Sequence, residues 1–265
     1  MTLNISTTDI RLQEPAFYTP FDVVIATDLD LDALSSINAA TRLSSRPFYC
    51  AGTHGLYGYI FADLISHDFS IERSASNIKT TPLTAETPSR TILSISSKTS
   101  PNPNQPAIET ITKREIYAPL ALANAAPLPA SILSSPRRLR AVSPLITLLR
   151  ALWEFQRLSA TRLPQSNNRP DLELFTTLAT ESHRNLQLPA ETLTSEALRS
   201  FLQNLGSELA PVTAVVGGRL SQDVINVLGR REQPIQNLCL FDGEATTGAV
   251  YAMHPPITKM EGASM

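Results

Sequence analysis

The chain has 265 residues, which is enough for one large domain or two small ones around a sizeable hydrophobic core. It carries 22 basic and 24 acidic residues, and this balance gives no electrostatic case for binding nucleic acid or an anionic membrane surface. No apolar run reaches the ~18 residues of a membrane span. The two cysteines, Cys50 and Cys239, each lie in an apolar run, so we expect buried thiols in an intracellular protein and no disulfide.

The first part of the chain predicts a parallel sheet. Residues 21–26, FDVVIA, form a short β-branched run that is typical of a strand buried on both faces. A cap at Thr27 or Asp28 and apolar residues at helical spacing then predict a helix over 31–42. Residues 48–51 give a second buried strand. A strand, a helix and a strand in this order form a β-α-β unit, in which the two strands lie parallel.

The glycines after this unit do not form a nucleotide-binding motif. Nucleotide folds place a glycine-rich turn between a strand and a helix N-terminus, where it holds phosphate. The loop GTHGLYG, residues 52–58, has a different glycine spacing, and strands are predicted after it over 59–64 and 69–72. We therefore interpret the loop as a tight turn between strands. Neither GxGxxG nor GxxxxGK[ST] occurs in the chain.

Residues 79–142 differ in composition from the rest of the chain. Half of the 20 prolines lie between residues 79 and 144, among many serines and threonines and without any glycine. Such a composition predicts a long excursion that contributes no compact core and is disordered near 98–106. Residues 108–117 could return to the sheet as a strand.

Helical patterns dominate residues 143–206. We predict a first helix that starts at Pro144, a second that is capped by Asp171, and a third that starts at Thr194 and ends at Gly206. These helices predict a small helical subdomain, inserted between the two halves of an α/β domain.

A long helix and a strand close the domain. Pro211 suits the first turn of the helix, and Gly229 with Pro234 beyond it predicts the end. Residues 210–218 are apolar or small on every side, which predicts burial. Residues 236–241 predict a buried strand. A polar stripe is predicted on the second half of the helix, formed by Arg219, Gln222, Asp223 and Asn226.

Two glycines, Gly217 and Gly218, lie in the middle of this helix, where each costs about 1 kcal/mol relative to alanine. Such a cost is explained if another backbone approaches the helix closely at this point. Two interpretations stay open, because the neighbour is either the chain's own sheet or a partner protein.

Several of these stretches together resemble a known family. ELAPVTAVVGGRLSQDVINVLG followed by PIQNLCLFDG is similar to the end of the adenylation-type (ThiF) domain of activating enzymes for ubiquitin-like modifiers. FYTPFDVVIATDLD, RPFYCAGTHGLYGYIFADLISHDF and KREIYAPLALA extend the resemblance over roughly half of the chain. The similarity is closest to the smaller, regulatory subunit of SUMO-activating enzymes. It implies a Rossmann-like α/β domain that is N-terminally incomplete and lacks its nucleotide-binding half.

The resemblance also implies a function for the position of Asp28. In catalytically competent relatives the equivalent strand ends in an Asp-Asn pair, followed shortly by Ala-Arg, and the aspartate assists Mg-ATP. Here Leu29 follows Asp28 and the Asn and Arg are absent, so we expect a degenerate Mg-ATP position and no catalytic residue. Asp28, Asp30 and Asp32 also suit a divalent cation, but the calcium-loop pattern is incomplete, and capping and solvated carboxylates are expected instead. No pair of the four histidines has metal-ligand spacing.

A heterodimer follows from the resemblance. The expected partner is the catalytic subunit of a SUMO-activating enzyme, which binds Mg-ATP, adenylates SUMO and carries the thioester cysteine. SUMO would be engaged through the complex, and no cofactor, nucleic acid or membrane is expected to bind this chain itself. The expected location is the nucleus, with the cytoplasm as the alternative. A regulatory subunit for another ubiquitin-like modifier and a scaffold derived from the fold are the other functions left open.

The candidate partner-interface residues all lie on the closing helix; they are Pro211, Val215, Gly217, Gly218 and Gln222. The predicted organisation has five segments: a first α/β portion over 1–78, the proline-rich excursion over 79–142, the helical insert over 143–206, the closing helix and strand over 207–254, and a tail over 255–265.

Overall fold

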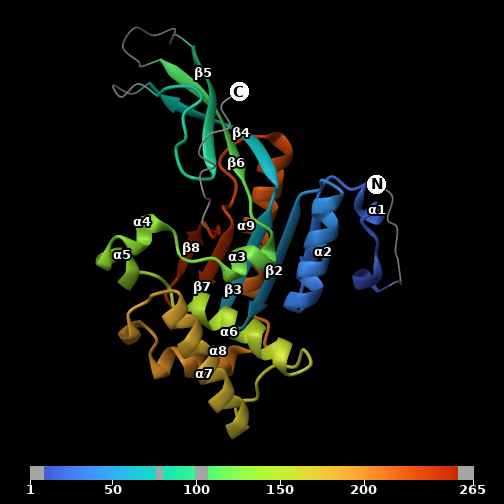
Figure 1. The fold of residues 1–265 in the computed structure, drawn as a ribbon, viewed down its shortest axis with the longest axis vertical. Coiled ribbons are helices and arrows are strands. Elements are labelled where there is room, and N and C mark those ends of the chain that lie inside the picture. Colours follow the sequence, from blue (N-terminus) through green and yellow to red (C-terminus); the bar gives the residue numbers. More distant parts are fainter. Residues whose placement is uncertain (1–8, 76–79, 99–106, 256–265) are drawn as a thin grey trace, which may run out of the picture.

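A computed structural model describes residues 9–75, 80–98 and 107–255, in which two sheets organise the chain (Figure 1). A five-stranded sheet with the order β1-β2-β3-β7-β8 forms the centre of the body. A three-stranded sheet with the order β4-β6-β5 projects from the body as an arm. The predicted α/β class is therefore confirmed, with a mixed main sheet. Residues 99–106, most of the segment predicted to be disordered, lie outside the described residues.

The predicted β-α-β unit is present as β1 (Val24–Thr27), α2 (Leu31–Leu43) and β2 (Phe48–His54), with β1 and β2 parallel. The prediction that the first strand is buried on both faces is wrong, because β1 is an edge strand of the sheet and Ile25 is 49% exposed. The helix cap also differs from the prediction, since the carboxylate of Asp30 caps the first turn of α2.

The other pairs of the main sheet are antiparallel. The chain turns at Gly55 from β2 into β3 (Tyr57–Asp63), which confirms the predicted tight turn at the glycine loop. Strand β3 pairs with β7 (Leu238–Asp242), which confirms the predicted closing strand, and β7 pairs with β8 (Thr247–Tyr251). The sequence does not predict β8, because TGAVY is short and only weakly apolar.

Helices cover both faces of β2 and β3. Successive side chains of a strand point to opposite faces, so alternate residues enter two separate hydrophobic clusters. The cluster that includes α2 and α6 takes Phe48, Cys50, Tyr59 and Phe61. The cluster that includes α9 takes Tyr49, Ala51, Ile60 and Ala62. Because both faces are covered, the two strands are apolar along most of their length.

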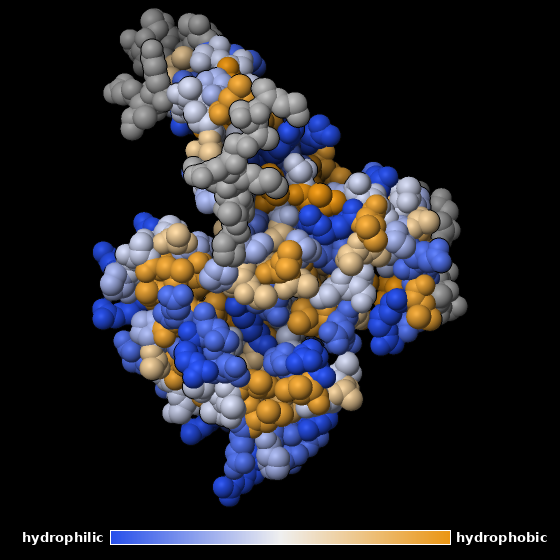
Figure 2. Space-filling model, viewed as in Figure 1, coloured by the Kyte–Doolittle hydropathy of each residue, from blue (hydrophilic) through white to orange (hydrophobic). Residues whose placement is uncertain are grey.

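The arm consists of β4 (Ser66–Ser74), β5 (Arg90–Lys98) and β6 (Ile108–Ile116), all antiparallel. The strand predicted over 108–117 is thus present, but it pairs within the arm instead of returning to the main sheet. An ion pair between Arg90 and Glu115 lies at the base of the arm. Figure 2 shows the arm standing clear of the body, with hydrophilic and hydrophobic residues interspersed on the face in view.

Residues 117–142 contribute to the main core, so the expectation that the proline-rich stretch contains no compact core is wrong for this part. Leu120 and Leu128 are 1% and 2% exposed. The side chain of Asn38 on α2 accepts a hydrogen bond from the backbone N–H of Leu120 at 2.7 Å, which holds the segment against the body. The stretch forms three short helices, α3 (Leu120–Ala125), α4 (Ala130–Leu133) and α5 (Pro136–Arg140).

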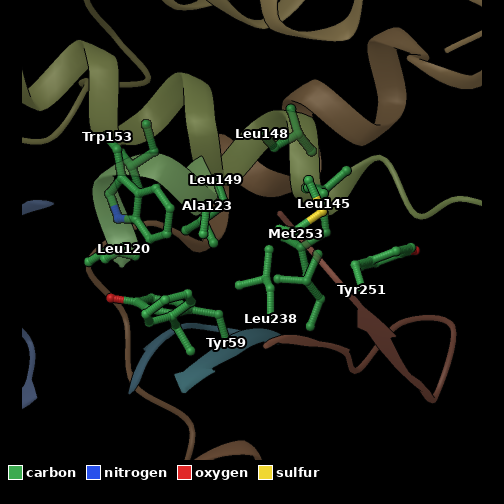
Figure 3. Packing of buried hydrophobic residues seen from close by; sticks show 14 of the residues in the cluster. Tyr59, Leu120, Ala123, Leu145, Leu148, Leu149, Trp153, Leu238, Tyr251 and Met253 are labelled. Carbon is green, nitrogen blue, oxygen red and sulfur yellow. The ribbon is translucent and has the colours of Figure 1, made fainter. Parts of the chain in front are cut away.

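The three helices predicted over 143–206 are present. Figure 3 shows Leu145, Leu149 and Trp153 of the first of them packed above Tyr59 and Leu238 of the sheet. They share one hydrophobic cluster with the sheet, and the separate subdomain stays a prediction. The helices of this region and of the N-terminal part are η1 (Ile10–Leu12), α1 (Pro15–Tyr18), α6 (Leu145–Leu158), α7 (Arg169–Asn185), η2 (Ala190–Thr192) and α8 (Ser195–Asn204).

The cap predicted at Asp171 is wrong, whereas Thr194 does cap the third helix. Helix α7 begins earlier, with Asn168 at the cap position. Asp171 lies in its first turn, buried, with its carboxylate 2.5 Å from Nη1 of Arg162. This arginine holds the pKa of Asp171 at about 2, below its ordinary value.

The closing helix, α9 (Ala210–Gly229), lies against β2 and β3 on the face opposite α6. Its buried residues recur at helical spacing, as expected for a helix packed along one side only. The prediction of burial all round is therefore wrong for residues 210–218. The buried stripe consists of Val212, Val216, Leu220, Asp223 and Val227.

Glycine has different roles on β3 and on α9. A Cβ at Gly58 of β3 would lie 2.6 Å from Cγ2 of Val216, so the sheet leaves room for α9 by omitting this side chain. A Cβ at Gly217 or Gly218 would meet nothing within 4 Å. The predicted close backbone contact at these two glycines is thus wrong for the chain's own sheet.

We predict opposite signs for two glycine-to-alanine substitutions. Gly58→Ala should lower the free energy of unfolding by about 1–3 kcal/mol, because overpacking displaces the stiff, buried Val216. Gly218→Ala should raise it by up to about 1 kcal/mol, because alanine favours helix and nothing opposes its methyl group. Urea unfolding followed by circular dichroism measures both. Destabilisation by Gly218→Ala would show that the helix is packed on this side.

Candidate functional site

The exposed face of α9 is the first candidate site. Pro211, Val215, Gly217, Gly218 and Gln222 are all exposed, and Val215 is 50% exposed. A rotation of about 100° per residue places four of the five on one stripe, with Gly217 to the side. The structure therefore brings together four of the five residues predicted as partner-interface candidates.

Small and apolar residues extend this face along the helix. Ile225 and Leu228 are 63% and 58% exposed, and Ala214 and Ser221 lie between them and the first turn. Arg219 is the only charged residue of α9 on its exposed side. A surface helix that packs on one side only ordinarily carries charged and polar residues on the other. This face instead has the composition of a contact surface, and we call it the α9 face.

Helix α9 is fixed to the sheet by a buried carboxylate. Asp223 Oδ2 accepts a hydrogen bond from the hydroxyl of Tyr49 at 2.7 Å, and Oδ1 accepts one from the backbone N–H of Ile235 at 2.9 Å. Burial raises the pKa of Asp223, and these hydrogen bonds act in the opposite direction. The prediction that Asp223 belongs to a polar surface stripe is wrong, because Asp223 is 3% exposed.

A cavity of about 430 Å³ lies between α9 and the β7–β8 hairpin. Val215 and Arg219 line it from the helix, and Phe241 and Val250 line it from the strands. Val250 is 45% exposed, so the cavity continues the apolar surface of the α9 face. Sequence reasoning missed this part of the site because it did not predict β8.

A second cavity, also of about 430 Å³, lies where β1 and β2 end. Because these strands are parallel, their carboxyl ends meet at one edge of the sheet, the place where open α/β sheets bind ligands. Asp28 follows β1 and is exposed, with a left-handed backbone φ of 56°. His54 ends β2, and Glu208 precedes α9. We call this cavity the crevice.

The charge of the crevice disfavours the phosphate groups of Mg-ATP. Phosphate groups are held by lysine, arginine or helix N-termini. The residues that line the crevice include the carboxylates of Asp28, Asp30 and Glu208 and contain neither lysine nor arginine. Capping and solvated carboxylates were expected for Asp28, Asp30 and Asp32, and the capping of α2 by Asp30 confirms the first part of this expectation. In the described ranges, His, Cys, Asp and Glu side chains do not gather in threes that could hold a metal ion.

The cysteines and histidines do not form a nucleophile–base pair in the part of the chain that the structure covers. Cys50 and Cys239 are buried, and burial raises the pKa of both thiols, so neither is activated. His183 contacts Thr147 and Thr192 inside the helical region. His254 lies 3.0 Å from the side-chain nitrogen of Gln236.

None of the helices built from described residues is long and apolar enough to cross a membrane.

Similar proteins are known, although no protein-family model matches the chain. DNA damage tolerance protein RHC31 of Saccharomyces cerevisiae is 29% identical over 242 residues, which are 91% of this chain and 67% of the relative. DNA damage tolerance protein rad31 of Schizosaccharomyces pombe is 27% identical over 88% of this chain and 61% of its own length. SUMO-activating enzyme subunit 1 of Homo sapiens is 26% identical over 96% of this chain and 69% of its own length.

These similarities support the resemblance that the sequence motifs predict, over nearly the whole of this chain. The chain spans about two thirds of the length of the relatives that it matches. The similarity therefore concerns this portion of the relatives, and it includes both β2–β3 and α9.

We predict that Asp223→Ala destabilises the chain by about 1–3 kcal/mol for each buried donor that loses its acceptor, the Tyr49 hydroxyl and the Ile235 N–H. Asp223→Asn should cost less, because it keeps one acceptor oxygen. A double-mutant cycle with Tyr49→Phe, measured by thermal and urea unfolding, should show strong coupling. Additive effects of the two substitutions would contradict the proposed anchor.

Proposed function

We propose that this chain is the non-catalytic, regulatory subunit of a SUMO-activating enzyme. In this proposal it forms a heterodimer with a catalytic subunit that binds Mg-ATP, adenylates SUMO and carries out thioester transfer. The similarity to proteins named SUMO-activating enzyme subunit 1 supports the enzyme class. The nucleus is the proposed location, with the cytoplasm as the alternative.

The observation that carries the regulatory role is the α9 face. Gly217 and Gly218 leave open space on a helix that is anchored firmly to the sheet on its other side. Small residues let a second backbone approach closely, and the exposed Ile225 and Leu228 supply apolar area to bury. A rigid surface built from small residues suits a partner that packs one of its own helices against α9.

The crevice supports the assignment of Mg-ATP to the partner. Its lining carboxylates repel phosphate, and the described residues that line it include no lysine or arginine to offset them. The buried, unactivated state of Cys50 and Cys239 likewise supports placing the thioester cysteine on the partner. A scaffold without a role in modifier activation, or a subunit for another modifier, would be distinguished by the partner that the chain selects.

We predict that Gly218→Leu weakens capture of the catalytic subunit of a SUMO-activating enzyme while the melting temperature of the free chain is kept. The leucine side chain fills the space that the partner would occupy but meets nothing within the chain. Thr177→Leu, on an exposed position of α7, is the matched control and should bind as the unmodified chain does. Capture of the catalytic subunit at full strength by Gly218→Leu would refute the α9 face as the interface.

The free chain should also fail to catalyse ATP–pyrophosphate exchange, and the chain should raise the exchange activity of its catalytic partner on mixing. The same assay with SUMO and with another ubiquitin-like modifier identifies the modifier. Exchange activity of the free chain would contradict the non-catalytic assignment.

A further inference from the structure

The arm joins the body where the chain has a strained residue. The chain enters the arm between β3 and β4 and leaves it after β6, and we call residues 63–66 and 116–118 the junction. Ile65, in the entering connection, has a left-handed φ of 61°. Glycine, asparagine and aspartate take this conformation readily, whereas a β-branched residue is a genuine outlier there, because its Cβ comes too close to a carbonyl oxygen. The junction is therefore strained at residue 65.

Hydrogen bonds of the backbone hold Ile65 in this conformation. Its N–H donates to Oδ1 of Asp63 at 3.0 Å, and its carbonyl accepts a hydrogen bond from the N–H of Tyr117 at 2.9 Å. Side-chain packing contributes little, since Ile65 is half-buried and neither of the two hydrophobic clusters built from described residues includes it. The strain at residue 65 is thus offset by its contacts with Asp63 and Tyr117.

Asp63 connects the junction to α2. Its carboxylate is fully buried, and Oδ2 accepts a hydrogen bond from the side-chain nitrogen of Asn38 at 2.7 Å. Nη1 of Arg42 lies 2.6 Å from Oδ1 and also donates to the carbonyl of Tyr117 at 3.2 Å. Asn38 and Arg42 both belong to α2, which lies beside the base of the arm (Figure 1). One helix therefore holds the entering and the leaving connection of the arm together.

A second set of contacts ties the arm to the segment that follows α9. The N–H of Ser70 on β4 donates to the carbonyl of Arg230 at 3.0 Å, and the N–H of Glu232 donates to the carbonyl of Ser70 at 3.1 Å. Nη2 of Arg90 on β5 donates to the side-chain oxygen of Gln236 at 3.1 Å. None of these contacts involves α2. They would remain if the junction opened, and the arm would then rotate about them.

We propose that the junction is a conformational switch that sets the direction of the arm. In the closed state, which is the one in the structure, Asp63 holds residue 65 in the left-handed conformation. In the open state Ile65 returns to an extended conformation, its hydrogen bonds to Asp63 and Tyr117 break, and the arm rotates about the segment that follows α9. Strained residues cluster in switch regions, because relief of the strain favours the second state. This inference does not rest on the proposed function.

Arg42 controls the balance between the two states. Its side chain is 28% exposed, whereas that of Asp63 is 0% exposed. A buried carboxylate that loses its cation is strongly destabilising, because it is left without compensation and away from water. Without Arg42, Asp63 reaches water only if the junction opens. Loss of the arginine should therefore shift the population towards the open state.

The direction of the arm is measured between two spin labels, attached to Glu72→Cys on the arm and Ser36→Cys on α2. Both positions are exposed, whereas Cys50 and Cys239 are buried and should remain unlabelled. Pulsed electron–electron double resonance gives the distribution of distances between the labels. We expect one narrow distribution when the rest of the chain is unmodified. In Arg42→Gln we expect a broader distribution that includes a new distance.

Two substitutions of Ile65 separate the effect of strain from that of the ion pair. Asparagine takes a left-handed φ readily, so Ile65→Asn added to Arg42→Gln should restore the narrow distribution. Ile65→Val keeps the β-branched side chain and is the matched control. Added to Arg42→Gln, it should leave the distribution broad.

Amide hydrogen exchange gives a second measurement, which does not require Arg42→Gln to fold. The N–H of Tyr117 is bonded to the carbonyl of Ile65, so it should exchange when the junction opens. In an otherwise unmodified chain, Ile65→Asn should slow this exchange by about ten-fold, and Ile65→Val should leave it unchanged. The N–H of Ser70 is bonded outside the junction and should exchange at one rate in all three proteins.

Three results would overturn the proposal. The first is a distance distribution in Arg42→Gln that equals that of the unmodified chain. The second is a broad distribution that Ile65→Asn does not narrow. The third is exchange of the Tyr117 amide at the same rate in Ile65→Asn and in the unmodified chain. Because every measurement uses the free chain, failure of the proposed heterodimer would leave these results unaffected.

Discussion

Helix α9 packs closely on the sheet where residue 58 of β3 has no side chain. Val216 occupies the space that a Cβ would need, and Asp223 then reaches the hydroxyl of Tyr49 and the N–H of Ile235. These contacts fix the rotation of the helix about its own axis. Once that rotation is set, the opposite side of the helix, with its small and apolar residues, has to face outward. The surface proposed to bind a partner is therefore a consequence of how α9 is anchored.

The same packing positions the crevice. Glu208 lies just before α9, and it reaches the carboxyl ends of β1 and β2 because Gly55 is hydrogen-bonded to Ser207. The edge of the sheet where related folds hold nucleotide here gathers carboxylates instead. Burial on one side of α9, open small residues on the other and negative charge at its N-terminal end make one continuous region.

Local sequence patterns predicted much of this arrangement. The β-α-β unit, the glycine turn, the helices after Pro144 and the strand before Asp242 follow from periodicity and from turn residues. The direction that Gly217 and Gly218 face could not be predicted, because a helix of small and apolar residues looks alike on every side until tertiary contacts choose one. The burial of Asp223 could not be predicted for a related reason. Its sequence neighbours place the carboxylate in a polar stripe, and they do not indicate that a tyrosine covers it. The crevice draws residues from β1, β2, α6 and the start of α9, and no local pattern brings these together.

The most direct test of the α9 face is the reactivity of a cysteine placed at its centre. Gly218→Cys introduces a thiol in open space, while Cys50 and Cys239 are buried and should react slowly. The labelling rate is measured by mass spectrometry in the free chain and after mixing with the catalytic subunit of a SUMO-activating enzyme. The account predicts rapid labelling in the free chain and strong protection in the complex. Slow labelling of the free chain, or equal labelling in a complex that demonstrably forms, would contradict it.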